Sequence, residues 1–261
     1  GRRYPYSICH WLYSTRENKG RDAGNKLRGA LFLPKPRHEA REGREDISPA
    51  MKVNCIVQVR LASTRLPGKA LLRIKGKPLI GYLLERLSLC KKTDKTIVAI
   101  PHSDWNSPLG LFLREWQARP FEIYSAPEGV ADEDVANRFA HVLQRYPCEA
   151  FVRICADSPL VDPALVDQAV EAFAKGGAAY LALRPMNIGG QCVEVVNAEA
   201  FAAALTGMTK EEREHVTLYF HRRQSMMVDT QADFDRLCFL IGKMDKPHTE
   251  YGWLGCLRLL S

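Results

Sequence analysis

Residues 53–69 read Val-Asn-Cys-Ile-Val-Gln-Val-Arg-Leu-Ala-Ser-Thr-Arg-Leu-Pro-Gly-Lys. The first part is a mainly apolar run of strand length, and the second part is a turn rich in polar donors. The turn contains three cations, two hydroxyl groups and a glycine, namely Arg60, Arg65, Lys69, Ser63, Thr64 and Gly68. Backbone N–H groups and charged side chains in such a loop can bind phosphate oxygens. The stretch therefore predicts the first strand of an α/β domain, followed by a phosphate-binding loop.

The pattern outward from this stretch alternates between strands and helices. The expected strands are Lys52–Val59, Thr96–Ile100, Phe121–Tyr124 and Ala150–Cys155. The expected helices are Pro78–Cys90, Leu109–Gln117, Asp132–Tyr146 and Pro163–Ala174. Strands that alternate with helices of about ten to fifteen residues predict a mostly parallel sheet that is covered by helices. The expected class is α/β and Rossmann-like, with helices on both faces of the sheet.

The alternation becomes less regular after about residue 178. Further strands are expected at Ala179–Leu183, Cys192–Val196 and Met226–Val228. Further helices are expected at Ala198–Leu205, Lys210–Tyr219 and Gln231–Leu240.

Composition and charge divide the chain at about residue 50. The chain of 261 residues is 46% hydrophobic and 26% charged, as is typical of soluble globular proteins, and its net charge is +7. Residues 1–50 hold eleven Lys/Arg and six Asp/Glu, a net charge of +5, which leaves only +2 for residues 51–261. We expect residues 1–50 to be a disordered basic extension, with a nucleic-acid or membrane arm as the alternative, and residues 51–261 to be a folded domain. The near-neutral domain does not predict a nucleic-acid partner.

No apolar run approaches the roughly 18 residues that indicate a membrane span, and no secretory signal is recognisable. The eight cysteines include no Cys-x-x-Cys pair, and several lie in apolar runs. They are expected to be buried free thiols in a reducing cytoplasm, with neither disulfides nor a zinc site.

Two aspartates stand at the ends of expected strands. Asp157 directly follows the strand Ala150–Cys155, at the edge where open α/β sheets bind ligands. It is well placed to hold Mg²⁺, since Asp162 is the better cap for the helix that begins at Pro163. Asp229 ends the expected strand Met226–Val228, and taken alone it would cap the following helix.

Taken in order, these segments resemble the sugar-activating cytidylyltransferases, which include the 3-deoxy-manno-octulosonate and acylneuraminate enzymes. The likeness is greatest to the spore-coat polysaccharide biosynthesis branch, and it runs from about Met51 to Leu240. The segments that carry it are the loop Arg-x-x-Ser-Thr-Arg-Leu-Pro-Gly-Lys, Gly76-Lys77-Pro78-Leu79, Asp132-Glu133-Asp134-Val135, Ala156-Asp157-Ser158-Pro159, Val193-Glu194-Val195, Arg213-Glu214-His215-Val216-Thr217 and Val228-Asp229-Thr230.

The resemblance implies that residues 51–261 are a nucleotidyltransferase domain with a nucleotide-diphospho-sugar transferase fold, with CTP as a substrate and Mg²⁺ as a cofactor. It implies a Mg²⁺-dependent enzyme that transfers CMP from CTP to an acidic sugar or related acid, with release of pyrophosphate, in surface polysaccharide or related biosynthesis. A homodimer is a further expectation. Transfer from another nucleoside triphosphate and a non-catalytic nucleotide-binding homologue remain alternatives, although the first loop is less glycine-rich than that of the pyrophosphorylase relatives.

The resemblance also implies roles for individual residues. Arg60, Lys69 and Asp157 would be catalytic, and Asp157 and Asp229 would bind the metal. Glu194, Glu214 and His215 would contact the sugar, although a hydrogen-bonded edge-strand carboxylate is an equal expectation for Glu194 and a solvated helix for the other two. The nucleotide would be bound by Arg60, Ser63, Thr64, Arg65, Gly68, Lys69 and Arg138, with a surface ion pair to Asp134 as the ordinary expectation for Arg138.

The chain departs from the pattern of this branch at two places. Relatives often have an aspartate two residues before the glutamate of the Val-Glu-Val strand, and Cys192 occupies that position here. The segment between His221 and Met227 is also short. An aspartate at that position would contact the sugar or the metal, and a longer segment would shape the acceptor pocket or a dimer element, so both differences bear on the identity of the acceptor.

Overall fold

The computed structural model describes residues 51–63, 65–116, 121–185, 188–224 and 231–260. Residues 1–50 form one unit of the chain and lie outside the described residues, as do Thr64, Asp229 and the expected strand Met226–Val228. The description below concerns the second unit, Met51–Ser261.

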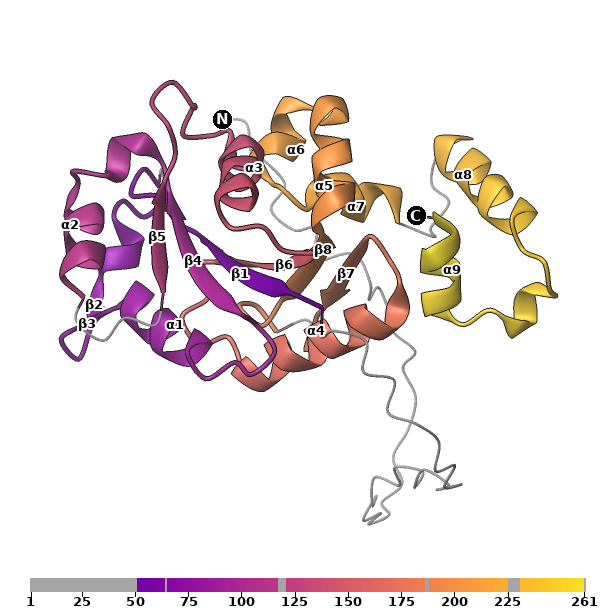
Figure 1. The fold of residues 1–261 in the computed structure, drawn as a ribbon, viewed down its shortest axis with the longest axis horizontal. Coiled ribbons are helices and arrows are strands. Elements are labelled where there is room, and N and C mark those ends of the chain that lie inside the picture. The colour runs from indigo at the N-terminus through magenta and orange to yellow at the C-terminus, as the bar shows by residue number, and fades with distance from the viewer. Residues whose placement is uncertain (1–50, 64, 117–120, 186–187, 225–230, 261) are drawn as a thin grey trace, which may run out of the picture. The chain divides into compact units, whose positions relative to one another are not determined.

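A six-stranded sheet forms the centre of this unit, in the order β5-β4-β1-β6-β8-β7 (Figure 1). The first four of these strands are parallel to one another, whereas β8 runs antiparallel to β6 and β7 runs antiparallel to β8. The strands are β1 (Val53–Gln58), β4 (Lys95–Ile100), β5 (Glu122–Ser125), β6 (Ala150–Cys155), β7 (Tyr180–Leu183) and β8 (Val193–Asn197). The predicted mostly parallel α/β sheet is confirmed. A short ribbon of β2 (Arg73–Ile74) and β3 (Lys77–Pro78) lies outside it.

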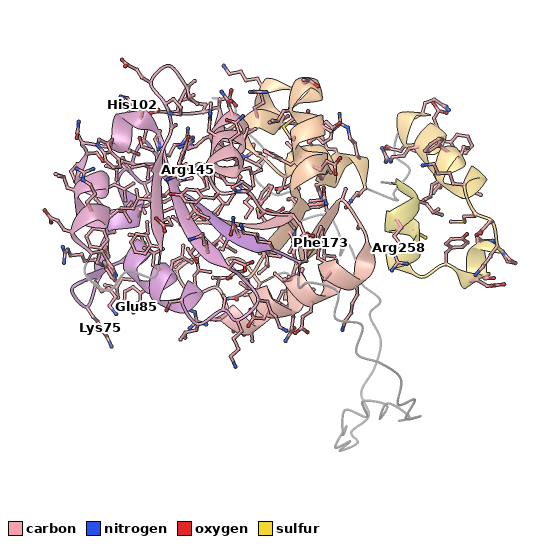
Figure 2. All side chains as sticks on the ribbon, viewed as in Figure 1. Lys75, Glu85, His102, Arg145, Phe173 and Arg258 are labelled. Atoms are coloured by element: carbon pink, nitrogen blue, oxygen red, sulfur yellow. The ribbon has the colours of Figure 1, made fainter. Side chains whose placement is uncertain are left out.

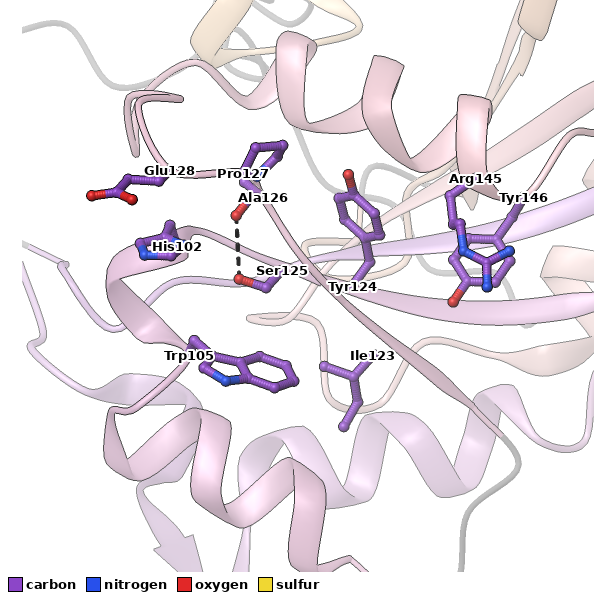
Figure 3. Close-up of a pocket in the computed structure, with 10 residues that line it drawn as sticks. All are labelled: His102, Trp105, Ile123, Tyr124, Ser125, Ala126, Pro127, Glu128, Arg145 and Tyr146. Atoms are coloured by element: carbon purple, nitrogen blue, oxygen red, sulfur yellow. Dashed lines mark hydrogen bonds between the residues drawn. The ribbon is translucent and has the colours of Figure 1, made fainter.

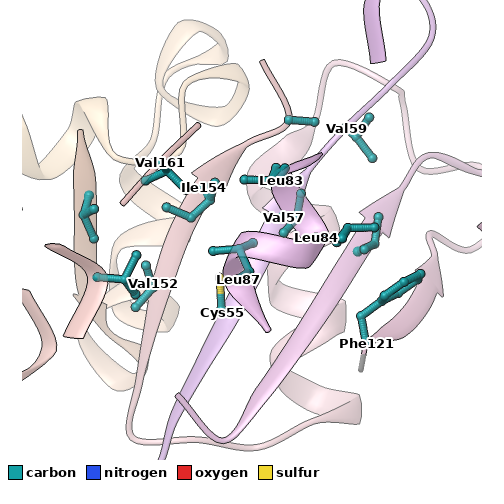
Figure 4. Close-up of a cluster of buried hydrophobic side chains, with 14 of the residues drawn as sticks. Cys55, Val57, Val59, Leu83, Leu84, Leu87, Phe121, Val152, Ile154 and Val161 are labelled. Atoms are coloured by element: carbon teal, nitrogen blue, oxygen red, sulfur yellow. The ribbon is translucent and has the colours of Figure 1, made fainter. Parts of the chain in front are cut away.

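Helices cover both faces of the sheet, as predicted. Successive strand residues point to opposite faces, so Cys55 and Val57 belong to one core cluster and Ile56 to the other. Figure 4 shows Cys55 and Val57 among the leucines of the first helix. The first face is covered by α1 (Leu79–Leu87), α2 (Pro108–Glu115) and α4 (Pro163–Gly176), and the second by α3 (Val135–Arg145), α5 (Ala198–Ala204), α6 (Lys210–Glu214) and α7 (Leu218–Arg223).

Local capping explains where two of these helices begin. Asp162 accepts a hydrogen bond from the backbone N–H of Ala164 at the start of α4, and Pro163 occupies the first helical position. The predicted capping role of Asp162 is therefore confirmed. Asp134 accepts from the N–H of Asn137, so α3 begins three residues later than predicted.

The single helix predicted over Lys210–Tyr219 is wrong, because the chain forms two helices there. The backbone leaves the helical path at His215, and Val216 is fully buried in the second core cluster. Burying this valine favours a turn over a continuous helix, which shows packing overriding local propensity.

Two helices follow at the carboxyl end of the described chain, α8 (Gln231–Gly242) and α9 (Trp253–Leu260). The first was predicted and the second was not. Arg258 of α9 donates hydrogen bonds to the carbonyl groups of Lys175 and Gly176 at the end of α4 (Figure 2). No helix among the described residues is both long and apolar enough to cross a membrane.

The seven cysteines in the described part of the chain are free thiols, as predicted. The prediction that they are buried is confirmed for Cys55. Cys238 on α8 is exposed, and the other described cysteines are partly exposed.

Candidate functional site

The described residues of the loop after β1, 59–63 and 65–69, are held by hydrogen bonds to their own backbone and to a buried aspartate. The N–H groups of Ser63 and Gly68 both donate to the carbonyl of Leu61, at 2.8 and 3.2 Å. The N–H of Leu61 donates to Oδ2 of Asp104 at 2.9 Å, and burial raises the pKa of the Asp104 carboxyl. Gly68 adopts a left-handed conformation with φ of 63°, which a side chain would strain. The loop is therefore built as a fixed turn.

Lys69 and Asp157 meet at the carboxyl ends of two adjacent parallel strands. The ammonium Nζ of Lys69 lies 2.6 Å from Oδ2 of Asp157. The two residues come from the loops after β1 and β6, which are paired along their length. Both side chains remain accessible, with 29% and 47% of their surface exposed. The structure thus brings together a cation suited to phosphate and a carboxylate suited to a metal ion.

Arg60 connects this loop to α6. Its guanidinium lies 3.0 Å from Oε1 of Glu214 and 3.8 Å from Oε1 of Glu133. The predicted residue Glu214 is therefore brought to the loop, where it contacts Arg60. His215, which ends α6, is exposed.

The other residues predicted to bind nucleotide are placed differently. Ser63 is half-buried and Arg65 is exposed, whereas Thr64 is not among the described residues. Arg138 is 1% exposed and donates from Nη2 to the carbonyl of Asp132 at 2.8 Å. Burial lowers the pKa of Arg138 to about 10, and its Nε and Nη1 have no hydrogen-bond partner among the described residues.

The expected surface ion pair between Arg138 and Asp134 is wrong. Arg138 is buried, and Asp134 caps α3 and pairs with Arg213 at 2.8 Å. A helical spacing of four residues predicted the pair, but α3 begins only after Asp134, so the two side chains do not share a helical face.

The described residues supply only some of the ligands that a metal ion would need. No group of three or more His, Cys, Asp or Glu side chains in this part of the chain is arranged to hold a metal ion. Mg²⁺ ordinarily takes one or two carboxylates together with phosphate oxygens and water. The accessible carboxylate of Asp157 beside a phosphate-type loop fits that kind of shared site. The other predicted ligand, Asp229, lies outside the described residues.

A second polar cluster lies on strands β6, β8 and β7 beneath α7, where Phe220 stacks on Tyr180. Glu194 of β8 is paired in register with Arg153 of β6, and Nη1 of Arg153 lies 2.6 Å from Oε2 of Glu194. The hydroxyl of Tyr180 donates to Oε1 of Glu194 at 2.7 Å. Burial by itself raises the pKa of Glu194, but the charge of Arg153 and these hydrogen bonds outweigh it and lower the pKa. Glu194 lies on an interior strand and is fully hydrogen-bonded, so its placement on an edge strand is corrected.

We expect Glu194→Gln to lower the free energy of unfolding by about 3 kcal/mol, because it leaves the charge of Arg153 buried and uncompensated. The measurement is urea unfolding at neutral pH. The lowered pKa of Glu194 means that its contribution is present above its unfolded value of 4.5 and is lost as the pH falls through the folded pKa. The difference between wild type and variant should therefore shrink in acid.

The control for this prediction is Glu171→Gln. Glu171 forms a surface pair with Lys92 at 3.3 Å, and both side chains are about half exposed. Such pairs contribute roughly 0 to 1 kcal/mol. Equal destabilisation by the two variants would contradict the role assigned to the buried pair.

Sequence reasoning missed Arg153, Tyr180 and Arg184, which surround Glu194. The sequence does contain an indication of this cluster, since Arg153 is the only charged residue in the apolar strand Ala150–Cys155. A cation and an anion in two neighbouring buried strands predict an ion pair, but only the register of β6 and β8 places them opposite each other.

A pocket of about 470 Å³ lies along the edge strand β5, and none of the predicted site residues lines it (Figure 3). His102 and Arg145 lie at its opposite ends. Arg145 belongs to the carboxyl end of α3, next to Tyr146, whose carbonyl accepts a hydrogen bond from Asn54 near the start of β1. The pocket therefore extends from the carboxyl edge of the sheet, where His102 follows β4, to the opposite edge.

Comparison with known proteins identifies related chains. A family model described as cytidylyltransferase matches residues 54–106 and 130–243, which is well over half of the chain. An uncharacterized protein of Methanocaldococcus jannaschii is 30% identical over 67% of this chain and 70% of its own length. The spore coat polysaccharide biosynthesis protein SpsF of Bacillus subtilis is 29% identical over 66% and 70%. The 3-deoxy-manno-octulosonate cytidylyltransferase of Geobacter sulfurreducens is 31% identical over about half of each chain, 49% and 48%.

A solved structure shows the same fold. The cytidylyltransferase from Leptospira borgpetersenii matches with a TM-score of 0.58 at 20% sequence identity, over 80% of this chain and 94% of that one. The predicted nucleotide-sugar transferase fold is thereby confirmed.

Proposed function

Because this chain belongs to the cytidylyltransferase family and is a CTP-dependent nucleotidyltransferase, we propose that it transfers CMP from CTP to an acidic sugar, with release of pyrophosphate and with Mg²⁺ as cofactor. The product would serve surface polysaccharide or related biosynthesis. The names of two relatives support the acceptor and the pathway, one being a 3-deoxy-manno-octulosonate cytidylyltransferase and the other a spore coat polysaccharide biosynthesis protein.

The observation that carries this proposal is the contact of 2.6 Å between Lys69 and Asp157. A nucleotidyltransferase must hold a polyanion and neutralise the charge that develops on its leaving group. The accessible ammonium of Lys69 can do both, and the half-exposed carboxylate beside it can hold the cation that accompanies a triphosphate.

The chemistry follows from these positions. An acceptor hydroxyl attacks the α-phosphorus of CTP and gives up its proton as the new O–P bond forms. The bond to the bridging α–β oxygen breaks, and pyrophosphate leaves with that electron pair. Lys69 and the exposed Arg65 would stabilise the negative charge on the leaving phosphate, and Arg60, oriented by Glu214 and Glu133, would bind a phosphate oxygen. Mg²⁺, when bound through Asp157, would supply further charge neutralisation of the triphosphate.

No covalent intermediate on the protein is needed in this scheme. The backbone of the loop after β1 is held in place around Leu61, which donates to Asp104 and accepts from Ser63 and Gly68. Preorganised donors of this kind commonly contribute the largest part of the rate enhancement.

The test is pyrophosphate release by the full chain with CTP, Mg²⁺ and either 3-deoxy-manno-octulosonate or N-acetylneuraminate. We expect release that depends on both CTP and an acid, and a CMP-sugar product of the corresponding mass. GTP, UTP and ATP serve as matched nucleotide controls and should give much slower release. Faster release with one of them would favour another nucleotide, and binding of CTP without turnover on any acid would favour a non-catalytic homologue.

A further inference from the structure

Six polar side chains lie on one face of the sheet, beneath α7. We call them the α7 cluster. Alternation along the strands places them on the same face as the second core cluster, because Ile56, Phe151, Tyr180 and Val196 belong to that cluster. The members of the α7 cluster are Gln58, Arg153, Tyr180, Arg184, Cys192 and Glu194.

Each nitrogen of the Arg153 guanidinium has an acceptor within this cluster. Its Nε and Nη2 donate to Oε1 of Gln58 at 3.2 and 3.1 Å. Its Nη1 donates to Glu194 at 2.6 Å and lies 3.5 Å from the hydroxyl of Thr217. Since Glu194 also accepts from Tyr180, the carboxylate and this guanidinium satisfy each other.

Arg184 is left without an anionic hydrogen-bond partner of its own. Its Nε donates to the Sγ of Cys192 at 3.1 Å, and a thiol is a weak acceptor. Its Nη2 lies 3.7 Å from Oε1 of Glu194, which is longer than a hydrogen bond. Neither terminal nitrogen of Arg184 donates a hydrogen bond to another described residue, and 31% of the side chain is exposed.

The cluster therefore carries one positive charge more than it neutralises. It holds two guanidinium groups and a single carboxylate. Burial raises the pKa of the Cys192 thiol, so the thiol stays neutral. Burial and the charge of Arg184 lower the pKa of the neighbouring His221, which adds no charge at neutral pH. The uncompensated charge is that of the Arg184 guanidinium, whose two terminal nitrogens can donate a pair of hydrogen bonds to one carboxylate of a ligand.

The cluster adjoins the site of phosphate chemistry. Gln58, which accepts hydrogen bonds from Arg153, is the last residue of β1, and its strand partner Cys155 is the last residue of β6, so both loops of that site begin beside the cluster. Asp157 follows Cys155 by two residues. A small acid bound at the cluster would thus lie beside the nucleotide.

We propose that Arg184 binds the carboxylate of the acceptor through its two terminal nitrogens and so selects acidic over neutral acceptors. This inference rests on the proposed transfer of CMP to an acidic sugar. It assigns the specificity for acidic acceptors to a residue outside the loops that bind the triphosphate. Glu194 is then neutralised by Arg153, which leaves the charge of Arg184 available to a ligand.

The test compares each acid with its methyl ester, which keeps the hydroxyl groups and removes the charge. The probes are 3-deoxy-manno-octulosonate and N-acetylneuraminate, and the measurement is the ratio of kcat/KM for acid to that for ester, with CTP saturating. The wild type should prefer the acid by about 10- to 100-fold, as expected for hydrogen bonds to a charged group. Arg184→Met should bring the ratio to roughly unity, chiefly through the KM of the acid, and leave the KM of CTP unchanged.

Two further variants test whether the effect is specific to the guanidinium of Arg184. In Arg184→Lys, the positive charge is kept but the planar fork is lost, so part of the preference for the acid should be retained. In Arg145→Met, a cation is removed from the opposite edge of the sheet, and the ratio should stay at the wild-type value (Figure 3). Thermal unfolding of each variant checks that the fold is retained.

The outcomes separate this inference from the proposed function. An unchanged acid preference in a folded, active Arg184→Met variant would place the carboxylate elsewhere and overturn the inference alone. Absence of pyrophosphate release by the wild type with every acid would overturn the proposed function, and the inference with it.

Discussion

Lys69→Met is expected to lower kcat/KM for CTP about 1,000-fold, the upper end of what removing one preorganised donor costs. Lys69 supplies the accessible ammonium next to Asp157, where charge would accumulate on the leaving pyrophosphate. Steady-state pyrophosphate release measures the effect. Because the side chain is partly exposed and its ion pair is near the surface, the free energy of unfolding should change by less than about 1 kcal/mol.

Lys92→Met is the matched control. Lys92 pairs with Glu171 and precedes β4, so it lies at the opposite end of the strand from the site. We expect its kcat/KM to equal that of the wild type. A Lys69→Met variant with wild-type turnover would show that the loop after β1 does not carry the chemistry.

Asp157→Asn should reduce Mg²⁺-dependent turnover by a similar factor of about 1,000, because an amide is a poor ligand for a hard cation. The side chain is 47% exposed and caps no helix, so the unfolding temperature should barely change. A second readout is the binding of Mn²⁺ in the presence of CTP, followed by electron paramagnetic resonance. The variant should bind the ion more weakly even where no turnover occurs.

Asp162→Asn provides the control for the aspartate. Asp162 lies on the same connection, but its carboxylate caps α4, and asparagine caps a helix equally well. Turnover and Mn²⁺ binding should both be retained. If Asp157→Asn and Asp162→Asn behaved alike, Asp157 would have no special role toward the metal.

Much of the fold follows from local patterns in the chain. The apolar runs that became β1, β4, β5 and β6 were predicted to within two residues, because a buried parallel strand is encoded in consecutive apolar residues. The caps at Ser107 and Asp162 have local causes as well, since each side chain bonds to an N–H two residues ahead. The break at His215 could not be predicted in this way, because it depends on burying Val216 in a distant core.

The candidate site divides in the same manner. The cation-rich turn after β1 and the aspartate after β6 could be predicted from local sequence, because both follow directly from where strands end. Three features required the folded structure: Arg60 contacts Glu214, 154 residues away, Arg138 is buried, and Arg184 lies beside the Arg153–Glu194 pair without a carboxylate in hydrogen-bond range. The physical reason is that contacts between distant segments depend on strand order and register, which no local window of sequence contains.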